Sequence, residues 1–439
     1  MTALMYTLGV VLFALGLAAS IGLHEVGHMV PAKKFGVKVT QYFVGFGRTL
    51  WSTKRGETEY GLKAIPLGGY VKLVGMLPPG RGEEGGRIRK SNTGMFTQLI
   101  SDARAAEYEL VEPGDEDRLF YKLPWWKKVI VMSGGPMVNL VLAFLLFGGV
   151  FMLHGAATPT TTVAEVSDCV IAATPAAVDQ EERECTPADP IAPAKAAGLQ
   201  VGDRLVSFNG TEVDSWDQMT GLIRANRDGE ATIVVERDGE QITTQTNTTV
   251  SPRPESGDNP GRIVQVGFLG VEPTIALERQ GPVFVVTTMG DYTWETVKAI
   301  GALPVRLAHA GMAAVGMEER AADSPMSVVG ASRVAGEFAS DERIPVGSRF
   351  ISLLMLLGGV NLFVGMLNFI PLLPLDGGHI AGALYEAVRR AFAKLFRRPD
   401  PGYFDVAKLL PVAYVMAAVF LVMTVVLVFA DIVAPVRIG

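Results

Sequence analysis

The residues with the clearest chemical meaning form the pentapeptide HEVGH, from His24 to His28. Two histidines four positions apart lie on one face of a helix, and Glu25 follows the first of them. Neutral imidazoles at this spacing bind zinc, and the glutamate between them acts as the general base of a metallohydrolase. It would take a proton from the attacking water and return it to the leaving amine. The sequence therefore predicts a hydrolytic Zn²⁺ site with His24 and His28 as ligands and Glu25 as the catalytic acid/base.

The elements that must position this site are hydrophobic. The chain of 439 residues is 49% apolar and only 19% charged, whereas soluble proteins contain about 25% charged residues. Four stretches lack charged residues and histidine, and each is long enough for the roughly 20 helical residues that cross a bilayer. We therefore expect a polytopic α-helical membrane protein with four transmembrane helices, over residues 1–31, 129–154, 350–380 and 409–431.

The segments between these helices differ in charge. Residues 33–128 contain 17 Lys and Arg against 11 Asp and Glu, residues 155–300 contain 10 against 22, and residues 381–408 contain 6 against 3. Because basic loops stay in the cytoplasm, we expect the first and third of these segments inside and the acidic one outside, with both termini extracytoplasmic. The net charge of -6 and the lack of a long basic run exclude nucleic acid as an expected partner.

A catalytic zinc needs a third protein ligand and one open position. The apolar stretches that begin at residues 1 and 350 both run inward, and Asp376 lies at a depth comparable to that of His24, toward the cytoplasmic side. His154 and His309 fall on the outer side and are unsuitable. Depth therefore favours Asp376 as the third ligand, with His379 as the weaker alternative.

The residues around Asp376 predict a break in the third span. The string NFIPLLPLDGGH, from Asn368 to His379, contains two prolines and two glycines where a straight helix would continue. Open backbone at membrane depth is tolerated only inside protein or beside a wet cavity. Asn368 would satisfy backbone groups freed by the break or hold a substrate strand, and the alternative is an ordinary interhelical hydrogen bond. That alternative applies more strongly to Asn139 and Asn361.

Residues 36–76 predict a membrane-associated β-hairpin. Two aromatic and β-branched arms flank the turn TKRGET, and the glycines of GFG and PLGGYV leave the backbone accessible. A strand edge beside the site would hold a substrate in extended form, and the substrate-binding residues that we expect there are Gly45, Phe46 and Gly47. The alternative is a hairpin that packs on the spans and touches no substrate.

Between the second and third spans, residues 160–254 predict a separate extracytoplasmic α+β domain. Its string AKAAGLQVGDRLVSFNG resembles the signature of bacterial PDZ domains, which bind extended peptides at a sheet edge. The alternative is a PDZ-like plug that binds no peptide. Cys169 and Cys185 lie in this outward domain, where a disulfide is permitted, and we favour the bond. The remaining segments are expected to be a polar cytoplasmic insertion over 77–128, an extracytoplasmic linker region over 255–349 and a cytoplasmic loop over 381–408.

Taken together, HEVGH, GFG, PLGGYV, GGPMVN, the PDZ-like domain and NFIPLLPLDGG resemble bacterial site-2 proteases over most of the chain. The resemblance is strongest to actinobacterial members that perform regulated intramembrane proteolysis. It implies a zinc endopeptidase of the bacterial plasma membrane with His24, His28 and Asp376 as ligands, Glu25 as acid/base and Asn368 as a substrate contact. The implied partners are single-span membrane substrates, such as anti-sigma factors cut first by a site-1 protease, and remnant signal peptides. The best-known members carry two PDZ domains, whereas one is recognisable here.

Two other classes of protein share some of these features. A catalytically silent membrane scaffold that presents a PDZ domain has no need to keep Glu25 together with the zinc ligands, and this sequence has the complete set. A metal transporter would place ligands on both sides of the membrane midplane, and here they gather on one side. The sequence therefore favours the protease.

Overall fold

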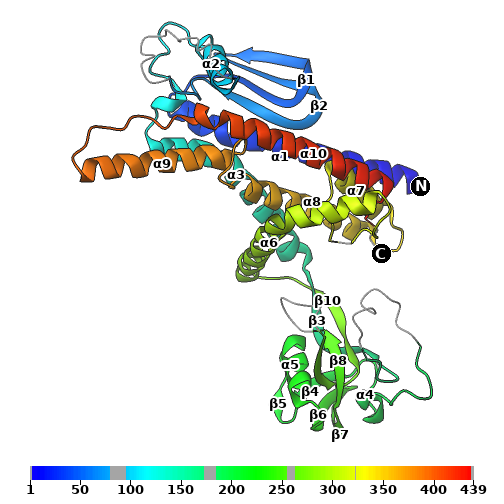
Figure 1. The fold of residues 1–439 in the computed structure, drawn as a ribbon. Coiled ribbons are helices and arrows are strands. Elements are labelled where there is room, and N and C mark those ends of the chain that lie inside the picture. Colours follow the sequence, from blue (N-terminus) through cyan, green and yellow to red (C-terminus); the bar gives the residue numbers. More distant parts are fainter. Residues whose placement is uncertain (1, 80–94, 173–183, 255–262, 322, 437–439) are drawn as a thin grey trace. The chain divides into compact units, whose positions relative to one another are not determined.

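The computed structural model describes residues 2–79, 95–172, 184–254, 263–321 and 323–436 (Figure 1). Its contacts divide the chain into two compact units. We call Met1–Val150 together with Gly281–Gly439 the helical unit, and Phe151–Gln280 the sheet unit. Each has its own hydrophobic core, and the candidate catalytic residues all lie in the helical unit.

Among the described residues, four helices are long and apolar enough to cross a membrane, as the sequence predicts. Many of their large apolar side chains are exposed to the surroundings, as expected for helices in contact with lipid. The four helices are α1 (Thr2–Lys34), α3 (Trp125–Gly149) with its short π-helical continuation η2 (Val150–His154), α8 (Val346–Leu367) and α10 (Leu410–Val433), which follows η3 (Val406–Leu409).

Close contacts hold α1, which carries HEVGH, against its neighbours. Gly27 of α1 and Gly134 of α3 approach so closely that a Cβ atom on either would lie within 2.4 Å of the other's carbonyl oxygen. Small residues of this kind let membrane helices pack backbone to backbone. On the other side, Asn361 Nδ2 of α8 donates a hydrogen bond of 3.0 Å to Ser20 Oγ, the interhelical bond predicted for this asparagine.

The third span ends earlier than predicted. Helix α8 ends at Leu367, residues 368–375 form turns and bends, and a new helix, α9 (Asp376–Leu395), starts at the predicted ligand. The expected break is present. The prediction of a single span over 350–380 followed by a loop over 381–408 is wrong, because α9 occupies the end of the first range and much of the second. The prolines stop α8, and the sequence after them regains helical periodicity, which the charge count alone did not reveal.

The segment 255–349 is not a linker where the structure describes it. The long helix in this segment carries Asp291, Glu295 and Lys298, so the absence of charge does not mark it in the sequence. A second helix packs through Ala335 on Phe13 of α1. The elements of this segment are β9 (Ile263–Phe268), β10 (Val271–Glu278), α6 (Pro282–Ala314) and α7 (Val328–Ser340).

The predicted hairpin is a broader sheet made of β1 (Val39–Arg55) and β2 (Thr58–Leu73), which are antiparallel. Each long strand bends and contributes two segments. Residues 39–44 lie between 69–73 and 59–62, and residues 49–55 pair with the far side of 58–63. The bend of β1 falls at Gly45 and Gly47, whose φ angles of +93° and +82° favour glycine. The segment 69–73 is therefore an outer edge of this sheet.

The polar insertion after β2 packs on other parts of the helical unit. Its helix α2 (Met95–Tyr108) is tied to the start of η3 by Arg104, whose guanidinium lies 2.7 Å from the Asp405 carboxylate. Lys38 Nζ, just before β1, lies 2.5 Å from Asp115 Oδ2, and this hydrogen bond holds the pKa of the Asp115 carboxyl below its ordinary value. The predicted range 77–128 also includes residues 80–94, which lie outside the described residues.

The sheet unit is built on a six-stranded sheet in the order β10-β3-β4-β6-β7, with β5 paired to β4. It extends to Gln280, beyond the predicted boundary at residue 254, because β10 pairs with β3 across the sequence. The turns Asn209-Gly210 and Asp238-Gly239 have the positive φ angles that tight hairpins need. The strands are β3 (Ala156–Val166), β4 (Arg204–Phe208), β5 (Thr211–Glu212), β6 (Glu230–Arg237) and β7 (Glu240–Asn247), with β8 (Thr249–Pro254) paired separately to β9.

One covalent link and one core stabilise the sheet unit. Cys169 and Cys185 form the disulfide that the sequence favoured, with Cα atoms 6.0 Å apart. Helix α5 (Trp216–Asn226) is capped by Ser215, whose side chain accepts a hydrogen bond from the backbone of Gln218. The helix buries Met219 and Ile223 against the apolar face of the sheet.

Candidate metal centre

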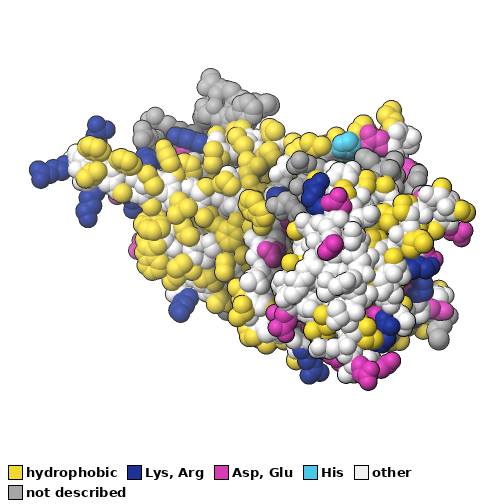
Figure 2. Space-filling model, turned by 90° about the horizontal axis from the view of Figure 1, so that it is seen from below, with side chains coloured by type: hydrophobic (Ala, Val, Ile, Leu, Met, Phe, Trp, Pro, Cys, Tyr) yellow, Lys and Arg dark blue, Asp and Glu magenta, His cyan; other side chains and the backbone are white. Residues whose placement is uncertain are grey.

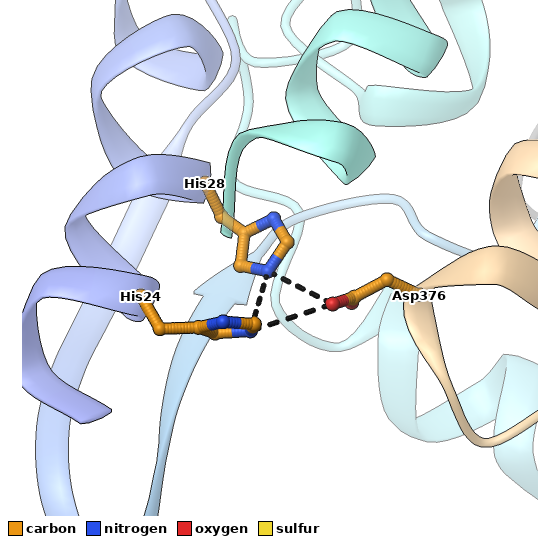
Figure 3. A group of neighbouring side chains, drawn as sticks. All are labelled: His24, His28 and Asp376. Atoms are coloured by element: carbon orange, nitrogen blue, oxygen red, sulfur yellow. Dashed lines mark hydrogen bonds and ion pairs between the residues drawn. The ribbon is translucent and has the colours of Figure 1, made fainter. Parts of the chain in front are cut away.

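Three side chains from two helices converge in the helical unit (Figure 3). His24 and His28 project from one face of α1, and Asp376 comes from the first residue of α9. His28 Nε2 lies 3.2 Å from His24 Nε2 and 3.3 Å from Asp376 Oδ2. His24 Nε2 lies 3.4 Å from the same carboxylate oxygen. The structure thus brings the histidine pair together with Asp376, and His379 is not a member of this donor group.

Helix α3 orients both imidazoles. His28 Nδ1 lies 2.8 Å from the carbonyl oxygen of Val131, which can only accept, so Nδ1 carries the proton and Nε2 presents its lone pair. His24 Nδ1 lies 3.3 Å from Asn139 Oδ1, which favours the same tautomer. Partners of this kind fix the ring orientation of histidine ligands in zinc proteins.

A glycine of α3 leaves room for the centre. A Cβ atom on Gly135 would lie 2.3 Å from His28 Nε2 and 2.6 Å from His24 Nε2, closer than any real contact. The His28 side chain is only 6% exposed, so it has little freedom to move away. Gly135 therefore keeps the space in front of the two donor nitrogens open.

The break after α8 places the Asp376 carboxylate. The N–H of Gly377 donates a hydrogen bond of 2.7 Å to the carbonyl oxygen of Asn368, so the loop closes back on the first turn of α9. A Cβ atom on Gly377 would lie 2.1 Å from the Ile370 carbonyl oxygen, and only glycine fits there. Asn368 is the C-cap of α8, and no described residue hydrogen-bonds its side-chain amide.

Glu25 lies against the outer edge of the β1–β2 sheet. The backbone of Val71 lies close to the Glu25 carboxylate. A Cβ atom on the neighbouring Gly69 would be 3.1 Å from Glu25 Cγ, so the strand approaches the helix closely. The residues at the candidate general base are thus Gly69 and Val71, which belong to the edge segment 69–73.

The predicted substrate-binding residues of the motif GFG lie beside the contact between Gly69 and Glu25, but do not form it. Val44 pairs with Gly69, and Gly45, Phe46 and Gly47 follow it at the bend of β1. The Phe46 side chain is 46% exposed and stacks on Tyr70, with ring centroids 6.3 Å apart. The GFG motif therefore flanks the sheet edge beside Glu25, but it is not the segment that touches this residue.

Sequence reasoning missed the residues that surround the donors. Asn139 and Gly135 lie in the string GGPMVN, from which the sequence predicts only an ordinary interhelical bond for Asn139. Its spacing from Gly135 by four residues, which puts both on one helical face, was the available signal. The carbonyl of Val131 leaves no mark in a sequence.

The donor set fits zinc. Two imidazole nitrogens, one carboxylate oxygen and an open position are a common catalytic zinc environment. With bonds of about 2.0–2.1 Å to a tetrahedral zinc, neighbouring ligand atoms lie about 3.3 Å apart. The three separations here are 3.2, 3.3 and 3.4 Å.

A group of donors that fits zinc, among helices that can span a bilayer and with a glutamate beside it, is typical of a membrane metallopeptidase. The model of Peptidase family M50 matches residues 12–398, and the chain belongs to this family, the site-2 proteases. It is 35% identical to the zinc metalloprotease Rip1 of Mycobacterium tuberculosis strain H37Rv, with 99% of each chain covered. It is 34% identical to Rip1 of Mycolicibacterium smegmatis, with 99% of this chain and all of the relative covered. Metalloprotease MmpA of Caulobacter vibrioides is 28% identical, with 85% of each chain covered.

The family and the four helices establish the general activity. The chain is a multi-pass membrane protein and a zinc metalloprotease of the site-2 type, as the resemblance in the sequence implied. Proteases of this type act on membrane substrates in regulated intramembrane proteolysis.

Proposed function

We propose that this protease cuts the transmembrane segments of single-span membrane proteins, with His24, His28 and Asp376 as the zinc ligands and Glu25 as the catalytic acid/base. The observation that carries the proposal is the position of the donor group. It lies between α1 and α9, with the candidate base in contact with a sheet edge. A substrate backbone held at that edge would reach the base and the zinc donors together.

The residues of the centre divide the chemistry among them. Bound zinc would polarise the scissile carbonyl and activate a water molecule for attack. Glu25 would accept the proton of that water and deliver it to the leaving amine nitrogen. The close approach of Gly69 and Val71 in the sheet edge would limit the movement of the Glu25 side chain between these two proton transfers. Val131 and Asn139 keep the imidazoles in the tautomer that binds metal.

The substrate would bind as an added strand. A helical peptide bond is shielded by its own hydrogen bonds, so the substrate must unwind before its carbonyl can align. The outer edge 69–73 offers a strand beside Glu25, with Gly69 allowing close approach. Phe46, between Gly45 and Gly47, would flank the bound strand with its exposed ring, and the Asn368 amide would bind its backbone.

The charge of the connecting segments supports the orientation proposed from the sequence. Basic residues 33–128 and 381–408 would face the cytoplasm, and the acidic sheet unit would lie outside with both termini. That unit, with β10 at its edge, would act as a PDZ domain that admits substrates with small outer portions. The substrates would be anti-sigma factors shortened by a site-1 protease, and remnant signal peptides.

The test is cleavage of a tagged single-span substrate by the purified protein in lipid vesicles, with the products mapped by mass spectrometry. We expect cuts inside the apolar segment, loss of cleavage with a zinc chelator and recovery on adding Zn²⁺. Cuts only in the polar flanks would contradict the proposal. A substrate that keeps its full outer domain should be cut more slowly than a truncated one, and equal rates would remove the gating role of the sheet unit.

A further inference from the structure

Helix α9 exposes large apolar side chains and buries a charged one, the opposite of a surface helix on a soluble protein. Its acidic residue Glu386 is 1% exposed and faces the protein interior. Glu386 Oε2 lies 2.8 Å from Lys128 Nζ of α3 and accepts a hydrogen bond from the Phe404 backbone. Its other oxygen lies 3.1 Å from Arg390. Glu386 on the polar face of α9 is thus used for packing on the protein.

The apolar face of α9 points outward. At 100° per residue, its large apolar side chains fall on one side of the helix, away from Glu386. They are between 46% and 74% exposed, which is unfavourable in water over so large an area. These side chains belong to Leu384, Tyr385, Val388, Phe392, Leu395 and Phe396.

A groove follows this face from the end of a membrane span. A cavity of about 260 Å³ is lined by Leu373 of the break, by Tyr385, by Leu409 at the end of η3 and by Val412 of α10. Tyr385 also lines a second hollow of about 550 Å³, which continues along Phe392. Because Tyr385 lines both hollows, they adjoin on the apolar face of α9. The smaller hollow lies beside the start of α10, and the larger one carries basic side chains.

The far end of the groove is cationic. Arg389 and Arg398 line the larger hollow, and Lys394 and Arg397 lie nearby on exposed surface. No acidic side chain among the described residues forms an ion pair with any of these four, because Glu386 and Asp400 contact Arg390 and Asp405 contacts Arg104. Figure 2 shows Lys and Arg side chains gathered beside hydrophobic ones at the end of the molecule that α9 forms.

We propose that this groove binds an anionic phospholipid, with an acyl chain along Tyr385 and Phe392 and the phosphate between Arg389 and Arg398. Two features favour a lipid over an acidic peptide, namely the continuity of the groove with α10 and the exposed apolar stripe beside it. Basic side chains next to an inserted apolar surface are the usual way to bind anionic lipids.

The test is native mass spectrometry of the full-length protein in detergent with added lipid. We expect phosphatidylglycerol to bind at least tenfold more tightly than phosphatidylcholine. The double substitution R389Q/R398Q should remove this preference. The matched control K34Q/K54Q removes two exposed charges from α1 and β1, outside the groove, and should keep it. Equal binding of both lipids by the unchanged protein, or equal loss in both double variants, would overturn the proposal.

Two further measurements distinguish the contribution of the acyl chain to binding from that of the head group. The substitution F392S/F396S, at exposed positions, should weaken binding of both lipids by a similar factor, and unchanged binding would contradict an acyl chain in the groove. Glycerol 3-phosphate in excess should not displace the lipid, whereas displacement would assign the site to a free phosphate anion. Zinc content is measured in the same samples and should be unchanged, so the result does not depend on the proposed proteolysis.

Discussion

Asp376 Oδ2 lies 3.3 Å from His28 Nε2, although Asp376 begins α9 and His28 lies near the end of α1. Helix α3 makes this meeting possible, because it contacts α1 at Gly27 and Gly134 and holds α9 through the ion pair between Lys128 and Glu386. The same helix supplies the oxygen atoms that orient both imidazoles. The centre is therefore a three-helix assembly in which α3 is the common support.

The identity of the third ligand can be tested by zinc content. In Asp376→Asn we expect zinc in the purified protein to fall well below one ion per chain, because the anionic oxygen near both imidazoles is lost. His379→Ala should retain zinc, since His379 is not among the converging donors. Zinc measured by plasma mass spectrometry decides between them, and the reverse pattern would assign the ligand to His379.

The asparagine beside His24 should affect metal affinity more than stability. In Asn139→Leu the Nδ1 atom of His24 loses its partner, and we expect zinc affinity to fall about 10- to 100-fold, as for other orienting residues of metal sites. Asn361→Leu is the matched control, because it also removes an interhelical bond to α1 but touches neither histidine. Competition with a zinc chelator measures both affinities. Equal losses in the two variants would show that the effect is only structural.

The open space at the centre should be sensitive to one methyl group. In Gly135→Ala the added Cβ would meet both donor nitrogens, so we expect at least a tenfold loss of zinc affinity. Gly149→Ala, on the same helix with no atom within 4 Å of its Cβ, should bind zinc normally. The same chelator competition measures both variants, and normal binding by Gly135→Ala would mean that the donors do not converge as described.

The sheet unit should lose stability in acid through Asp203. Burial raises the pKa of this carboxyl, but two hydrogen bonds of 2.7 Å from Arg237 and one from the Gln200 backbone lower the pKa more, below its ordinary value of 3.8. A lowered pKa in the folded state gives stability that is present above the unfolded-state pKa and is lost as pH falls through the folded-state value. The urea midpoint should therefore fall from about pH 4 downward, and less steeply in Asp203→Asn.

Trp216, which packs against the core of the sheet unit, reports this unfolding. The measurement uses fluorescence of the full chain with the other four tryptophans replaced by phenylalanine. Identical pH dependence with and without the Asp203 carboxyl would contradict the assignment.

Much of the helical unit could be predicted from the sequence because its signals are local. A charge-free stretch marks a span, and the prolines and glycines after Asn368 mark a break, whatever the rest of the chain does. HEVGH fixes two donors through helical spacing alone. Depth in the membrane then selected Asp376, and the structure places its carboxylate beside both histidines.

The features that were missed depend on contacts between distant segments. Helix α6 contains Asp291 and Glu295, so it is not a charge-free stretch. The outward orientation of the apolar face of α9 follows from the ion pair between Glu386 and Lys128, which the sequence does not predict. The bends that divide β1 and β2 into four paired segments follow from pairing across the hairpin, and no single residue predicts them. The contact of Glu25 with Gly69 is likewise a tertiary event.

The most direct test of the central claim is the substitution Glu25→Gln, followed with a tagged single-span substrate in membranes. The amide keeps the shape of the side chain but cannot accept the proton, so we expect cleavage to fall by about 10²- to 10⁴-fold while zinc stays bound. Cleavage at the unchanged rate, with zinc present, would contradict the account.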